Sequence, residues 1–209
     1  MTAAPFITTS SSTGRKRPSF RWRVVDIVVA SVIGVASGLV FVAWNIAHEP
    51  LSNLVAFLPG LSALFGGGWL FAGVLTALVV RKPGAAIYGE FLAATVSALV
   101  GNQWGALTLV SGLVQGLGAE LVFAAFLYTN WRLSGTVLAG MGAGLAMAIT
   151  DLTLWYPGAG ILFITVYSIS AIVSGAVIAG LLSWLAMRGL ARTGALSRFA
   201  AGRDVAAPR

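Results

Sequence analysis

The sequence predicts an all-α membrane protein of six transmembrane helices, with both termini in the cytoplasm. Hydrophobic residues make up 58% of the 209-residue chain and charged residues only 9%, whereas a typical soluble domain is about 25% charged. The 13 basic and six acidic side chains are too few to cover a soluble protein of this size. This composition excludes a soluble enzyme. It also argues against nucleic-acid binding, despite the net charge of +7.

Long apolar runs define the expected helices. A helix needs about 20 apolar residues to cross about 30 Å of hydrocarbon. The third run is the shortest, and only Arg81-Lys82-Pro83 separates it from the second. Pro83 suits the start of a new helix. The expected spans are about 24–47, 61–80, 84–100, 105–130, 134–155 and 160–187.

The two ends of the chain are polar and basic. We expect residues 1–23 to be a disordered basic tail, 24–187 a six-helix membrane domain, and 188–209 a second basic tail. The first apolar run is longer than the roughly 7–15 residues of a signal-peptide core, so it should be retained as a span. The tails also suit contact with anionic lipid headgroups, and docking onto cytosolic partners is the alternative.

The basic residues predict the orientation. With the N-terminus inside, all 13 Lys and Arg residues fall in the two tails, at Arg81 and Lys82, or at Arg132. The three outer connections contain none. Because Lys and Arg accumulate in short cytoplasmic loops, both termini are expected in the cytoplasm of a multi-pass plasma-membrane protein.

Three acidic residues lie within the expected spans without a basic residue at the same depth: Glu90, Glu120 and Asp151. Such groups usually face the bundle interior or an aqueous cavity, where they are protonated, hydrated or matched by an external cation. At about 1.5 Å per residue, Glu90 and Gln115 would both lie about 15 Å beneath the outer boundary, which predicts one shared pocket.

The other two acids differ in their expected depth. Asp151 lies about 6 Å below the outer end of its helix, near the mouth of that pocket. Glu120 lies about 22 Å down, in a stripe with Gly112 and Gly116 that favours a helix–helix contact. For each acid the structural alternative is a protonated carboxyl that is hydrogen-bonded across helices. That alternative is favoured for Glu120 and evenly balanced for Asp151, whereas a ligand role is favoured for Glu90.

Small residues recur every four positions on two spans. Ala30, Gly34 and Gly38 form one stripe, and a second runs through Gly140, Gly144 and Ala148. Such stripes allow helices to approach closely, most often within one chain. The first stripe starts near the cytoplasmic side, which makes it the better candidate for docking another membrane subunit.

Motifs for catalysis are missing. The chain has no Cys and a single His, His48, so a metal site is not expected and no cofactor is implied. It contains no phosphate-binding G-x-x-x-x-G-K-[ST] motif, no G-x-S-x-G and no H-E-x-x-H. Any ATP hydrolysis would therefore have to come from partner subunits.

Several segments, in order and spacing, resemble one family. They are Arg81-Lys82-Pro83-Gly84-Ala85-Ala86 followed by Glu90, Gly101-Asn102, Gln115-Gly116-Leu117-Gly118-Ala119-Glu120, Leu138-Ala139-Gly140-Met141-Gly142 and Ser174-Gly175. Over about residues 24–190 the chain resembles the YkoE family, which are the substrate-binding S components of energy-coupling-factor (ECF) transporters. The string from Gln115 to Glu120 is the most specific piece.

The resemblance implies a six-helix bundle that captures thiamine or its hydroxymethylpyrimidine precursor from outside the cell. It also implies a transmembrane T component and two ATPase subunits as partners, the T component meeting the Ala30-Gly34-Gly38 stripe. The segment 48–60 would cover the site.

Thiamine carries a permanent positive charge, which matches the surplus of buried acids. Glu90 could neutralise this cation, while Asn102 and Gln115 could bind the pyrimidine edge. Aromatic rings at the outer ends could stack on the ligand or belong to an interfacial belt. The expected binding residues are Glu90, Gln115, Asn102, Asp151, Trp104, Trp44, Tyr156, Trp155 and Glu120.

Two other functions remain open from the sequence. A proton-coupled secondary carrier could use Glu90, Glu120 or Asp151 as proton relays. A noncatalytic membrane assembly factor would bind neither a small molecule nor an ATPase.

Overall fold

The computed structural model describes residues 20–206, and this part of the chain folds entirely as helices and connecting loops. Two segments depart from α-helical geometry, since η1 is a 3-10 helix and η2 is a π-helix. The segment η1 leads into α2, and η2 follows α6 and leads into α7. Each therefore extends a neighbouring α-helix and is not a separate helix. The elements are α1 (Val24–Leu54), η1 (Leu61–Trp69), α2 (Phe71–Val80), α3 (Ala85–Val100), α4 (Leu107–Ala125), α5 (Leu133–Leu154), α6 (Ile161–Ser174), η2 (Gly175–Leu182), α7 (Ser183–Arg192) and α8 (Ala200–Ala206).

Five helical stretches are long and apolar enough to cross a membrane. They are Val24–Leu54, Leu61–Val80, Leu107–Ala125, Leu133–Leu154 and Ile161–Arg192. The third run predicted from the sequence is present as the apolar helix α3, but its 16 residues are fewer than the about 20 of a perpendicular span. The protein is therefore a multi-pass membrane protein, with the third of six expected spans shorter than the others.

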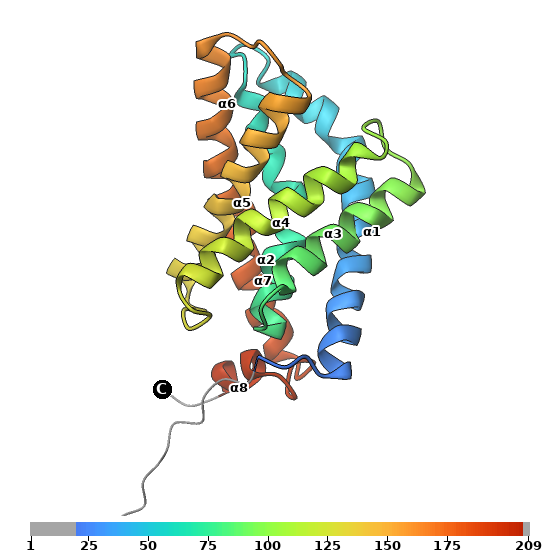
Figure 1. Cartoon of the computed structure of the whole chain (residues 1–209), viewed down its shortest axis with the longest axis vertical. Helices are drawn as coiled ribbons and strands as arrows, with labels where there is room; N and C mark the ends of the chain where they lie inside the picture. Colours follow the sequence, from blue (N-terminus) through green and yellow to red (C-terminus); the bar gives the residue numbers. More distant parts are fainter. Residues whose placement is uncertain (1–19, 207–209) are drawn as a thin grey trace, which may run out of the picture.

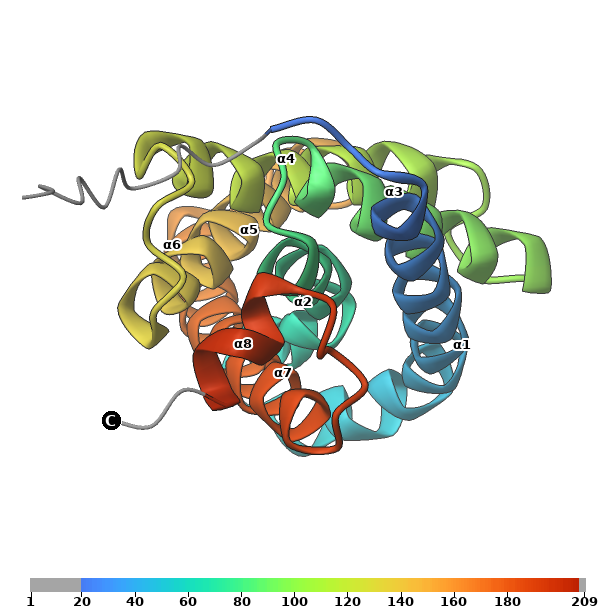
Figure 2. The ribbon, with the colours of Figure 1, turned by 90° about the horizontal axis from the view of Figure 1, so that it is seen from below.

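Helix α2 forms the centre of the bundle. Eight of its ten residues are buried, and the other helices surround it when the molecule is viewed from below (Figure 2). The surrounding helices expose large apolar side chains, such as Val32, Leu99 and Ile161. Apolar side chains can face outward in this way because lipid, rather than water, surrounds a membrane protein.

Small residues bring α1 and α3 together. The stripe of Ala30, Gly34 and Gly38 is buried within the chain. A Cβ on Gly38 would lie 2.8 Å from the backbone oxygen of Ala93 and 2.5 Å from the Cβ of Val96. The stripe expected to dock a partner is thus already covered by α3.

The second stripe has the same kind of role between α5 and its neighbours. A Cβ built on Gly140 would press against the backbone oxygen of Gly175, and one on Gly144 against that of Ala171. Both contacts join α5 to the stretch formed by α6 and η2. This stripe is therefore an intramolecular packing face.

The connections between helices gather at two ends of the bundle. The start of α1, the α2–α3 and α4–α5 connections and α8 lie at the lower end of Figure 1, and the other three connections lie at the upper end. The tail expected over 188–209 is helical in part, because α7 continues to Arg192 and α8 follows. Leu196 and Phe199 are buried, and Arg81 pairs with Asp204 at 2.5 Å. Residues 1–19 of the expected N-terminal tail lie outside the described residues.

Candidate binding site

A cavity of about 110 Å³ is lined by residues of α1, η1, α3, α4, α5 and α6. Its wall combines polar and aromatic side chains, a pattern typical of small-molecule sites. The polar lining residues are Asn45, His48, Ser62, Glu90, Ser97, Thr108, Ser111, Gln115 and Asp151. The aromatic lining residues are Phe41, Trp69, Trp104, Trp155, Tyr156 and Tyr167.

Glu90 is the most deeply buried charged group of this wall, with 1% of its surface exposed. Its Oε2 accepts a hydrogen bond from the backbone N–H of Gly73, at 2.7 Å. Its Oε1 is buried and has no hydrogen-bond partner within residues 20–206. A buried polar atom without a partner is costly, so this oxygen is suited to a ligand that brings a donor or a positive charge.

Glycines on both neighbouring helices make room for Glu90. A Cβ on Gly73 of α2 would lie 3.1 Å from the Glu90 side chain, and one on Gly116 of α4 would lie 3.0 Å from it. The carboxyl group therefore fits between α2 and α4 only because these two positions carry no side chain. The Gly112-Gly116 stripe noted in the sequence thus helps to build the cavity wall.

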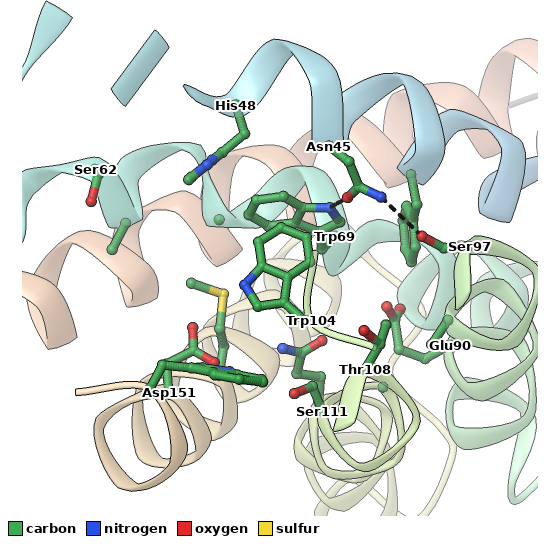
Figure 3. A pocket seen from close by; sticks show the side chains of 18 of the residues that line it. Asn45, His48, Ser62, Trp69, Glu90, Ser97, Trp104, Thr108, Ser111 and Asp151 are labelled. Carbon is green, nitrogen blue, oxygen red and sulfur yellow. Dashed lines mark hydrogen bonds between the residues drawn. The ribbon is translucent and has the colours of Figure 1, made fainter. Parts of the chain in front are cut away.

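An aromatic row crosses the cavity next to Glu90. The ring of Trp69 lies 4.5 Å from that of His48 and 5.2 Å from that of Trp104, the latter in an edge-to-face arrangement. The Trp69 indole N–H donates to Asn45 Oδ1 at 2.8 Å, and the Asn45 amide donates to Ser97 Oγ at 3.1 Å. Figure 3 shows this chain of hydrogen bonds, which fixes the position of Trp69 from α1 and α3.

Asp151 lies on the other side of Trp104 from Glu90 (Figure 3). The Tyr167 hydroxyl donates to Asp151 Oδ2 at 2.6 Å, and the Tyr156 and Tyr167 rings are 5.4 Å apart. Burial raises the pKa of the Tyr156 phenol above its ordinary value, and the nearby Asp151 carboxyl raises it further. The phenol stays neutral, so among the described residues Asp151 is the acidic group at this end of the cavity.

The structure brings six of the predicted binding residues to one cavity: Glu90, Gln115, Trp104, Asp151, Trp155 and Tyr156. Gln115 is buried, and its amide makes no hydrogen bond with the described part of the chain. An amide that faces the cavity in this way has both a donor and an acceptor available for a ligand.

Three predicted binding residues lie outside the cavity wall. Asn102 organises the loop before α4, since its Oδ1 accepts hydrogen bonds from Trp104 N and the Thr108 hydroxyl. The Trp44 indole donates to the Phe65 backbone oxygen at 3.0 Å, which joins α1 to η1. These hydrogen bonds are thus with the protein itself, although the Asn102 Nδ2 is buried and has no hydrogen-bond partner within residues 20–206.

Glu120 belongs to α4, and its carboxyl lies against the start of α3. Its carboxyl oxygens accept hydrogen bonds from Gly84 N at 2.6 Å, from Ala86 N at 2.9 Å and from the Tyr128 hydroxyl at 2.8 Å. Backbone N–H groups at a helix N-terminus are unpaired within the helix and favour a negative charge. Glu120 therefore makes a helix–helix contact, as its place in the stripe with Gly112 and Gly116 predicts.

Sequence reasoning missed several wall residues, above all Asn45, Trp69, Ser97 and Tyr167. Asn45 carried a usable signal, because it is a polar side chain near the outer end of an apolar run. Trp69 carried none, because it sits inside a glycine-rich run whose 3-10 conformation was not expected. The residues described by the structure contain no group of three or more His, Asp and Glu side chains that could together hold a metal ion.

The chain resembles known transport proteins along most of its length. Residues 25–146 match the family model of a permease component of an ABC-type cobalt transport system. The HMP/thiamine permease protein YkoE of Bacillus subtilis (strain 168) is 35% identical over 189 residues, which cover 88% of this chain and 92% of the relative. The crystal structure of an S-component of an ECF transporter superposes with a TM-score of 0.83 at 35% identity, covering 88% of this chain and 93% of the other.

Proposed function

Because the chain belongs to the YkoE family of ECF-transporter S components, we propose that its cavity captures thiamine or hydroxymethylpyrimidine (HMP) from outside the cell. The chain is a substrate-capture subunit, and the relative YkoE is named for HMP and thiamine. Family membership favours this role over a proton-coupled carrier or an assembly factor. What we propose for this chain is the identity of the ligand, thiamine or HMP.

The observation that carries the proposal is the unpartnered Oε1 of Glu90 inside the cavity. Thiamine offers a thiazolium cation and an exocyclic amino group, and HMP offers the same amino group. Either a cation or an N–H donor of the ligand would give Glu90 Oε1 a partner, while Gly73 N–H donates to Oε2. Hydrogen bonds to a charged group contribute about 1.5–3 kcal/mol, enough to make Glu90 the anchor.

The aromatic row supports the same ligand class. Trp69 and Trp104 line the cavity, and Trp104 lies between Glu90 and Asp151. A flat heteroaromatic ring can stack on such faces, and a cation over them gains about 0.5–2 kcal/mol. Gln115 supplies the amide donor and acceptor that a pyrimidine edge requires.

The proposed orientation places this cavity at the outer face of the plasma membrane. Six helices would cross or enter the bilayer, with α3 as a short sixth span and both termini in the cytoplasm. The support is that every Lys and Arg lies in the tails, at residues 81 and 82, or at residue 132. A T component and two ATPase subunits would supply the power stroke, because this chain has no phosphate-binding loop of its own.

Titration of the purified full-length chain with thiamine and with HMP tests the proposal. Calorimetry measures the affinity, and tryptophan fluorescence reports contact with the cavity wall. Glu90→Gln should weaken binding of thiamine by about 10–100-fold, because a charge-assisted contact of about 1.5–3 kcal/mol is lost. Glu120→Gln is the matched control, since it changes a buried glutamate that does not line the cavity.

The control separates a binding role from a folding defect. Glu120→Gln should bind thiamine within about threefold of the natural chain, even if it melts at a lower temperature. If neither thiamine nor HMP binds the natural chain, the ligand assignment is wrong. If Glu90→Gln binds thiamine as the natural chain does, Glu90 is not the anchor.

A further inference from the structure

We propose that the cavity selects the free alcohol of its ligand and rejects the phosphate ester, with Asp151 as the residue that determines this specificity. The inference rests on the proposed function, since it concerns the same cavity. Thiamine and HMP each carry a primary hydroxyl group, and phosphorylation converts it into an anion. The structure provides a carboxyl group near either end of the cavity, and no Lys or Arg of the described residues 20–206 lines it.

The distribution of charge over the cavity carries the argument. Glu90 and Asp151 lie on opposite sides of Trp104 (Figure 3), and within residues 20–206 no Lys or Arg lines the wall. A phosphate group would therefore meet a carboxyl whichever way round the ligand entered. Phosphate sites in proteins are built from Arg, Lys or clustered backbone N–H groups. Burying an anion without such a partner is costly.

The two carboxyl groups differ in what they leave for a ligand. Glu90 is held by a backbone N–H and is almost fully buried, which suits the cationic or amino-bearing part of the ligand. Asp151 is half-buried, and its Oδ2 accepts from the Tyr167 hydroxyl at 2.6 Å. Its other oxygen can accept a hydrogen bond from an alcohol. The same oxygen would repel a phosphate.

His48 is the one wall residue that could acquire a positive charge and pair with a phosphate. Its ring nitrogens lie within hydrogen-bond distance of Ser52 Oγ, the nearer at 3.2 Å, and the ring packs against Trp69. These contacts are satisfied by a neutral imidazole. In this neutral form His48 supplies no positive charge, and the experiment includes it as the residue that could contradict the proposal.

Thiamine and thiamine monophosphate form the matched pair of probes, because they differ only in the phosphoryl group. Titration of the purified full-length chain should give an affinity for the ester at least about 100-fold weaker, since like charges brought together cost several kcal/mol. Asp151→Asn keeps an oxygen that can accept from Tyr167 but removes the charge. It should narrow the ratio of the two affinities by about tenfold.

Glu49→Gln is the control for a general change of charge, because Glu49 is an exposed carboxyl next to the cavity but not in its wall. It should leave the ratio of affinities within about twofold. The ratio is the useful readout, since a structural defect at Asp151 would weaken both ligands alike and leave their ratio unchanged.

The results separate the inference from the proposed function. Equal binding of alcohol and ester would overturn the inference and leave thiamine capture intact. Loss of ester binding alone in His48→Gln would also overturn it, by making His48 a phosphate ligand. If the ratio of thiamine to thiamine monophosphate affinity is unchanged in Asp151→Asn, Asp151 does not determine the specificity. Failure of thiamine itself to bind would refute the proposed function.

Discussion

Asn45 offers the sharpest test of how the cavity is preorganised. Its side chain joins Trp69 to Ser97, and both of its polar ends are used in doing so. Asn45→Ala removes this link without touching Glu90. We expect the variant to fold and to bind thiamine more weakly, because the Trp69 indole is no longer held in its position.

The size of the effect follows from the two lost hydrogen bonds. Ser97 Oγ loses only the donor that the Asn45 amide supplied, but the Trp69 N–H points from a fixed ring and loses its acceptor. An unsatisfied buried donor costs about 1–3 kcal/mol. If ligand binding must restore the indole to its position against this cost, the affinity falls by about 5–100-fold.

The measurement is a calorimetric titration with thiamine, and two further variants serve as its controls. Ser97→Ala removes only the second hydrogen bond and should weaken binding by less than about threefold. Asn53→Ala changes an exposed asparagine of the same helix and should leave the affinity unchanged. If Asn45→Ala binds as tightly as Asn53→Ala, the hydrogen-bonded position of Trp69 has no role in capture.

Two further predictions concern stability. Glu120→Ala removes the acceptor of three hydrogen bonds at the start of α3 and should lower the free energy of unfolding by about 3 kcal/mol or more. Tyr128→Phe removes one of these bonds and should lower it by about 1 kcal/mol. Equal melting temperatures for the two variants would contradict this prediction. Gly140→Ala presses a methyl group against the backbone of η2 and should destabilise by about 1–3 kcal/mol. Gly189→Ala has no atom within 4 Å of the new methyl and should be neutral or slightly stabilising, and the same loss in both variants would refute the packing argument.

Much of the fold follows from the sequence because lipid is a simple solvent. A segment that crosses it must satisfy its backbone internally, so the length of an apolar run predicts a helix directly. The runs at 24–47 and 134–155 correspond to α1 and α5 in this way, although α1 continues to Leu54. The conformations of η1 and η2 could not be predicted, because they depend on close contacts made by glycines with distant segments.

The sequence predicts a site residue correctly where the depth of that residue in the membrane is enough to place it. Glu90 and Gln115 were expected at the same depth, and both line the cavity. Asn102 and Trp44 were chosen for their residue type near the outer ends of helices, and type does not say which way a side chain turns. Asn102 turns back to the loop before α4 and Trp44 turns to η1, directions that depend on tertiary packing.

The first-helix stripe shows why a pattern of small residues has two meanings. A helix surface of Ala and Gly permits close approach by any neighbour, whether that neighbour belongs to the same chain or to a partner. In this protein Leu92 and Val96 of α3 contact Gly34 and Gly38, so the close neighbour at these two positions belongs to the same chain. A T component that bound this stripe would need α3 to move away first, and α3 also carries Glu90. Docking through the stripe would then disturb the proposed anchor of the vitamin, which would link partner contact to release of the ligand.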